Sequence, residues 1–71
     1  MPAVPKYARV ADAIRQQIRA GTLRPGDRLP TTDQLLVEHG VGYGTLRTAL
    51  LLLEAEGLIE GRPGDGRYVK G

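Results

Sequence analysis

The 71-residue chain has no cysteine, no tryptophan, no phenylalanine and a single histidine. Without cysteine, neither a disulfide nor a thiolate metal centre can form. The lone His39 has no cluster of other ligands in sequence, so we expect no metal and no cofactor. The longest apolar run, residues 49–53, is far shorter than the roughly 18 residues of a membrane-spanning helix. Residues 1–5 resemble neither a signal peptide nor a lipidation signal, so a cytoplasmic protein is expected.

The net charge is also small, at +2. The basic and acidic side chains are nevertheless unevenly distributed along the chain. Residues 1–30 hold six basic against two acidic side chains. Residues 31–57 hold Arg47 alone against four acidic side chains, and residues 58–71 hold three basic against two acidic. The basic charge therefore flanks the centre of the chain. A chain of this length is expected to form one domain, residues 1–71, with a thin core.

Apolar spacing predicts three helices. The first runs from about residue 5 to 20, with apolar positions at helical spacing and Gly21 beyond its end. The second covers about residues 32–39, because Thr31 and Gln34 together form the sequence pattern of a capping box. The third begins near Gly42 and ends before Gly57. A short second helix, a glycine-containing turn and a third helix predict a helix-turn-helix at about residues 31–57.

Two short β-prone runs, residues 58–60 and 67–69, flank a glycine-rich segment and predict a hairpin, or wing, at about residues 58–70. Arg28 and Leu29 are expected to form a very short strand, which Pro30 prevents from extending. The expected fold is mainly α with a small β-hairpin: helix, strand, helix, helix, strand, strand, which is a winged helix-turn-helix. Residues 1–5 are expected to be a flexible N-terminus.

Several motifs in this order resemble the GntR family of bacterial transcription regulators, specifically its N-terminal DNA-binding domain. The resemblance covers about residues 6–69. The matching pieces are Tyr7, the run 21–30 (GTLRPGDRLP), Leu35, Gly40-Val41, Thr45-Leu46-Arg47, Ala49-Leu50, the run 53–59 (LEAEGLI) and the run 64–69 (GDGRYV).

The resemblance implies that double-stranded DNA is the partner and that three groups of residues contact it. These lie at the start of the second helix, at the start of the third and in the wing: Thr31, Thr32 and Asp33; Tyr43, Gly44, Thr45, Arg47 and Thr48; and Arg62, Pro63, Gly64, Gly66 and Arg67. The chemistry agrees, because threonine hydroxyls and helix N-termini suit phosphate oxygens. Arg47 can reach guanine in the major groove, although it could instead be a surface charge.

The chain departs from the family pattern in the helix-turn-helix itself. Asp33 stands where the family commonly has arginine, and Gly42-Tyr43-Gly44 replaces a hydroxyl residue, arginine and a polar residue. Tyr43 either stacks on DNA or covers the edge of the core. Leu51 and Leu52 replace polar or basic residues, and at least one of them must face outward. We hypothesise that this leucine supports a homodimer or a partner surface.

These features predict a sequence-specific DNA-binding regulator of transcription, more often a repressor, that blocks polymerase as a homodimer on a palindromic operator. Family members carry a C-terminal effector and dimerisation domain, so an excised domain is favoured over a minimal regulator. The alternative is a winged-helix module that binds protein, which the acidic balance of residues 31–57 would suit. An enzyme is not expected, because no nucleophile–base pair is recognisable. The glycine-rich run 61–66 also lacks the lysine and strand-to-helix setting of a phosphate loop.

Overall fold

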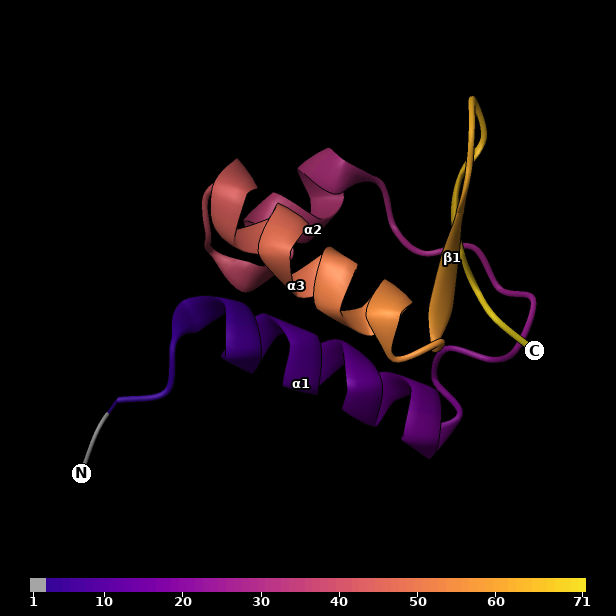
Figure 1. Cartoon of the computed structure of the whole chain (residues 1–71), viewed down its shortest axis with the longest axis horizontal. Helices are drawn as coiled ribbons and strands as arrows, with labels where there is room; N and C mark the ends of the chain where they lie inside the picture. The colour runs from indigo at the N-terminus through magenta and orange to yellow at the C-terminus, as the bar shows by residue number, and fades with distance from the viewer. Residues whose placement is uncertain (1–2) are drawn as a thin grey trace.

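The computed structural model describes residues 3–71, which form three helices followed by an antiparallel hairpin (Figure 1). The helices are α1 (Lys6–Ala20), α2 (Thr32–His39) and α3 (Tyr43–Ala55), and the strands are β1 (Ile59–Arg62) and β2 (Gly66–Val69). Pro5 precedes α1 as its N-cap, and residues 3–5 have no regular structure. Residues 1–2 of the predicted flexible N-terminus lie outside the described residues. The predicted helical fold with a small hairpin is confirmed.

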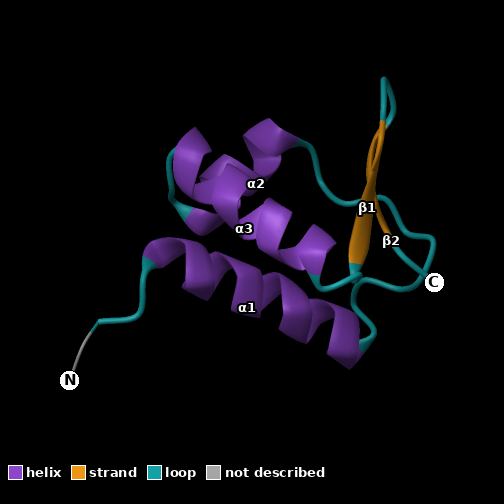
Figure 2. Ribbon diagram, viewed as in Figure 1, coloured by secondary structure: helices purple, strands orange, loops and turns teal. Residues whose placement is uncertain are grey.

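The hydrophobic core lies where α1 and α3 pack side by side and the hairpin closes one end (Figure 2). Every element contributes buried apolar side chains to it: Val10, Ala11, Ile14, Leu29, Leu35, Leu46, Ala49, Leu50, Leu53, Ile59 and Val69. On α3 the buried positions recur every three or four residues, which leaves the opposite face of that helix in solvent. Within residues 3–71, each helix is too short or too polar to cross a membrane.

The segment between α1 and α2 runs along the outer side of β2. The Leu29 amide donates to the Arg67 carbonyl at 2.9 Å, and the Val69 amide donates to the Asp27 carbonyl at 2.8 Å. The strand predicted at Arg28 and Leu29 is nevertheless reduced to one bridge, between Arg28 and Tyr68. The reason is that a turn at Gly26 (φ 88°) precedes it and Pro30, which has no N–H to donate, follows it.

The helix-turn-helix is fixed by caps that are local in sequence. The Thr31 hydroxyl accepts from the Gln34 amide at 3.2 Å, and the Gln34 side chain accepts from the Thr31 amide at 2.9 Å. This confirms the predicted capping box. Gly40 ends α2 in the left-handed region (φ 64°), which an L-residue with a side chain adopts at a cost. The turn then leads directly into Tyr43 and orients the start of α3.

Arg15 joins α1 to the C-terminal end of α3. Its guanidinium donates two hydrogen bonds to the Glu56 carboxylate, at 3.0 Å from Nε and 2.7 Å from Nη2. This bond, more than the nearby charge, lowers the pKa of Glu56. A carboxylate at a helix C-terminus is disfavoured by the helix dipole, so the partner from α1 offsets an unfavourable position.

Replacing Glu56 with glutamine should destabilise the protein in a pH-dependent way. Because folding lowers the pKa of Glu56, its stabilising effect is present above the ordinary carboxyl pKa of about 4.3 and is lost as the pH falls through the lowered value. The urea midpoint of Glu56→Gln should therefore lie below that of the wild type at pH 7, and the two should converge in acid. Glu38→Gln is the control, since no basic side chain of residues 3–71 pairs with Glu38. A gap that persists unchanged in acid would contradict this account.

Candidate nucleic-acid interface

The outward face of α3 lies opposite the core and carries four exposed residues one turn apart, namely Gly44, Arg47, Thr48 and Leu51. No acidic side chain of the described chain pairs with Arg47, so its guanidinium is available to an external acceptor. Leu51 is 52% exposed, whereas Leu52 packs against the core. The expectation that at least one of these leucines faces outward is thereby confirmed.

The first turn of α3 presents backbone and side-chain groups beside that face. Gly42 is the N-cap and supplies no side-chain acceptor, so the first amides of α3 keep their capacity to donate to an anion. Tyr43 is 58% exposed, which favours contact with an external partner over covering the core edge. Thr45 is half-buried and lies between the buried and the outward faces of the helix.

The start of α2 is held by its own cap. The Thr31 hydroxyl already accepts a hydrogen bond, so capping is its first role. Thr32 is half-buried, and Asp33 is exposed in the first turn. A negative charge at this position interacts favourably with the helix dipole. Asp33 therefore stabilises α2, a structural role that the sequence pattern did not reveal.

The wing projects beyond the helices, on the side of α3 away from α1 (Figure 1). Its predicted contact residues Arg62, Pro63, Gly64 and Gly66 are exposed. Arg62 lies 4.1 Å from the centre of the Tyr68 ring and pairs with Glu60 at 3.2 Å. The Tyr68 hydroxyl donates to Asp65 at 2.8 Å, and this bond raises the pKa of Tyr68. These contacts hold the tip of the wing in one shape.

Arg67, another predicted contact residue, is turned toward α3. Its Nε lies 3.5 Å from the Glu54 carboxylate, too long for a good hydrogen bond but close enough for an ion pair. The pair borders a groove of about 380 Å³ between α3 and the wing, lined by Glu54, Gly61, Arg62, Pro63, Gly66 and Arg67. No local pattern in the sequence indicates that Glu54 and Arg67 are partners.

Arg28 is a basic residue of this region that sequence reasoning did not assign to the site. Its bridge to Tyr68 brings the side chain along the wing, where a Cβ on Gly66 would lie 3.1 Å from the Arg28 Nε. Gly66 thus leaves room for the guanidinium. The sequence feature that could have indicated this role is the position of Arg28 directly before Leu29-Pro30 in the run 21–30, from which only a short strand was predicted.

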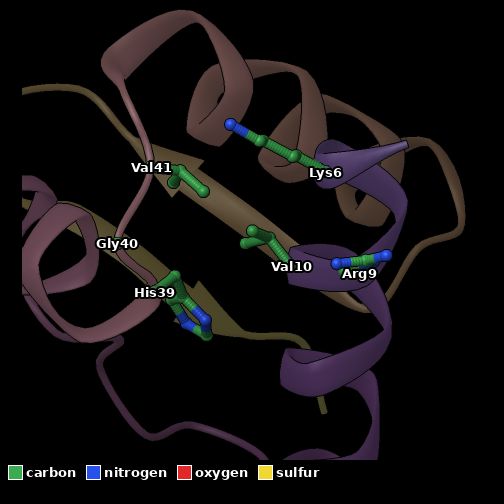
Figure 3. Close-up of a pocket in the computed structure, with 6 residues that line it drawn as sticks. All are labelled: Lys6, Arg9, Val10, His39, Gly40 and Val41. Atoms are coloured by element: carbon green, nitrogen blue, oxygen red, sulfur yellow. The ribbon is translucent and has the colours of Figure 1, made fainter. Parts of the chain in front are cut away.

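A separate pocket, which contains two basic side chains, lies between α1 and the turn of the helix-turn-helix (Figure 3). It has a volume of about 280 Å³ and is lined by Lys6, Arg9, Val10, His39, Gly40 and Val41. No acidic residue is among the lining residues, so Lys6 and Arg9 add positive potential next to the start of α3. The His39 Nε2 is buried without a hydrogen-bond partner in residues 3–71.

Comparison with known proteins agrees with this arrangement. The sequence model described as bacterial regulatory proteins, gntR family, matches residues 6–69. A relative named mannosyl-D-glycerate transport/metabolism system repressor MngR, from Escherichia coli, is 47% identical over 66 residues. That match covers 93% of this chain and 28% of the relative, so the chain spans less than a third of that protein.

Solved structures show the same fold. The DNA-binding domain of AraR in complex with its operator ORR3 superposes with a TM-score of 0.90 at 34% identity, covering 96% of this chain and 82% of that one. YtrA from Sulfolobus acidocaldarius, described as a GntR-family transcription factor, gives a TM-score of 0.88 at 34% identity, covering 99% and 73% of the two chains.

Proposed function

Because the chain belongs to the gntR family of bacterial regulatory proteins, we propose that it is the part of a transcription repressor that binds double-stranded DNA in a sequence-specific manner. The observation that carries this proposal is the similarity, over 96% of the chain, to a domain solved on its operator. The exposed guanidinium of Arg47 on the outward face of α3, which has no acidic partner among residues 3–71, supports it. The proposed place of action is the bacterial cytoplasm, and no catalytic role is assigned.

In this proposal α3 enters the major groove, where Arg47 donates to a guanine edge. The amides of the first turn of α3 and Thr45 face the phosphates, while Tyr43 packs on a sugar or base. Thr31, Thr32 and Asp33 at the start of α2 lie along the DNA backbone. The wing, through Arg62, Pro63, Gly64, Gly66 and Arg67, contacts the flanking sugar-phosphate chain.

We further propose that two copies bind a palindromic operator and exclude polymerase. A single recognition helix covers only a few base pairs, and two-fold paired helices read half-sites one helical turn apart. The match covers 28% of the MngR length, and no effector site is proposed within residues 3–71.

Selection of binding sites from random duplex DNA tests the proposal. The full 71-residue chain should enrich one sequence, either a half-site or a palindrome of two half-sites. Enrichment should disappear in Arg47→Ala. If the chain enriches nothing at low salt, where electrostatic attraction is strongest, the proposal is wrong and a protein-binding winged helix becomes the better reading.

Releasing Arg67 from α3 should strengthen DNA binding. In Glu54→Gln the side chain keeps its size but loses the charge that holds Arg67 and that repels phosphate. The affinity should rise, and the plot of log affinity against log salt should steepen by about 0.9, the value of one additional phosphate contact. Stability should change little, since both side chains stay about one-third exposed and an ion pair in contact with solvent contributes about 0–1 kcal/mol.

The matched control is Glu38→Gln, which removes the same charge from a side chain that pairs with no basic residue of residues 3–71, and it should leave the affinity and the salt slope almost unchanged. If Glu54 acts by keeping Arg67 away from DNA, the double variant Glu54→Gln, Arg67→Ala should bind DNA no more tightly than Arg67→Ala alone. A gain of the same size in both backgrounds would contradict the assignment.

A further inference from the structure

The outward face of α3 is unusual in that Arg47 is its only long polar side chain. Its neighbours there are Gly44, Thr48 and Leu51, and the last is more than half exposed. We propose, building on DNA binding as the function, that Thr48 and Leu51 select thymine by contacting its C5-methyl group in the major groove. In this reading the exposed leucine serves DNA recognition and not a contact between two copies of the chain.

Thr48 uses its hydroxyl hydrogen within the helix. The Oγ1 donates to the Gly44 carbonyl at 3.0 Å, one turn earlier. That proton is therefore not available to a base, so the hydroxyl could only accept a hydrogen bond, and the methyl group is the part of the side chain that can make an apolar contact. An exposed methyl group on a helix that lies in the major groove is suited to the thymine methyl.

Leu51 extends the same apolar strip. It follows Arg47 by four residues, Thr48 by three and Gly44 by seven, so all four side-chain positions lie on one face of the helix. A Cβ placed on Gly44 would meet no atom within 4 Å, so the surface at this position is open. The absence of a side chain there lets a base edge approach the helix closely and reach the methyl of Thr48.

The chemistry of the groove makes this surface selective. Among the four bases only thymine presents a methyl group in the major groove, next to its O4 acceptor. Thr48 and Leu51 could form no hydrogen bond with guanine, adenine or cytosine through their outward carbon atoms. The proposed half-site therefore combines a guanine, read by Arg47, with one or two thymines beside it.

Deoxyuridine tests this directly, because it pairs like thymidine but lacks the methyl group. The enriched duplex is prepared with one thymine at a time replaced by deoxyuridine, and binding is measured with the full chain. The wild type should bind about fourfold more weakly at one or two positions, the effect of losing one buried methyl group. At those positions the ratio of the affinity for thymine to that for deoxyuridine should fall toward one in Thr48→Ser and in Leu51→Ala.

Thr48→Ser is a narrow change, since serine keeps the hydroxyl that bonds to Gly44 and lacks only the methyl group. Thr22→Ser, in the exposed segment after α1, is the matched control and should keep the full preference for thymine. Equal binding of the wild type to every thymine and deoxyuridine duplex would overturn the inference while leaving operator binding intact. The same holds if the preference survives in both variants. If the chain shows no sequence-specific binding at all, both the proposed function and this inference are wrong.

Discussion

Arg47→Ala should lower operator affinity by about one to two orders of magnitude, because a bidentate arginine–guanine contact contributes about 1–3 kcal/mol to discrimination. Arg47 is the only basic residue on the outward face of α3, so no neighbour on that face can replace it. The change should leave the fold intact, since the side chain is exposed and makes no ion pair within residues 3–71. Fluorescence anisotropy with the enriched duplex gives the affinity, and thermal unfolding checks the fold.

Two further variants separate a base contact from simple charge. Arg47→Lys keeps the positive charge but loses the planar fork, so it should bind the operator nearly as poorly as alanine while retaining non-specific binding. Arg24→Ala removes an exposed arginine from the segment between α1 and α2, away from the outward face, and should change affinity much less. Equal losses for Arg47→Ala and Arg24→Ala would mean that Arg47 supplies charge and no sequence information.

Leu53→Ala should have the largest effect on stability. Leu53 has 0% exposure and lies on α3, the helix that packs against both α1 and β1. Removal of a fully buried leucine side chain costs about 2–5 kcal/mol, which is comparable to the whole stability of a domain this small. We expect the variant to be largely unfolded at 37 °C, as measured by urea denaturation followed by circular dichroism.

Leu51→Ala is the matched control for Leu53→Ala, being the same change on the same helix at a side chain 52% exposed. It should cost less than about 1 kcal/mol, because little apolar surface is returned to water. If Leu51→Ala proved as destabilising as Leu53→Ala, the assignment of the buried and outward faces of α3 would be wrong.

Features that depend on neighbouring residues could be predicted from the sequence. The capping box of Thr31 and Gln34 fixed the start of α2, and the helical spacing of leucines identified the buried face of α3. Such signals lie within one or two turns of the chain, where the physical cause and the pattern coincide. The motifs resembling the GntR family then gave the order of the elements and the family itself.

Contacts between residues distant in sequence could not be predicted. Arg15 and Glu56 are 41 positions apart, and neither residue signals its partner locally. Likewise, Arg67 was expected to contact DNA, and no local pattern indicated Glu54 as its partner. The structure brings them together because the hairpin folds back along α3, so a charge counted as available to DNA is partly held by the protein itself.

The short strand at Arg28 and Leu29 shows a similar limit. Its β-tendency was recognised, but a strand is defined by its ladder, and the turn before it and Pro30 after it permit only one bridge. The alternatives for Tyr43 also needed the structure, because the 58% exposure of its side chain there distinguishes one that faces outward from one that covers the core. The individual DNA contacts stay predictions.

The central claim, that this surface recognises a DNA sequence, is tested most directly by titrating the enriched duplex and a scrambled duplex of equal composition over a range of salt concentrations. The account predicts much tighter binding to the enriched duplex at every salt concentration. It also predicts that log affinity falls linearly with log salt for both, by about 0.9 per phosphate contact. Equal affinity for the two duplexes, or an affinity that does not change with salt, would contradict it.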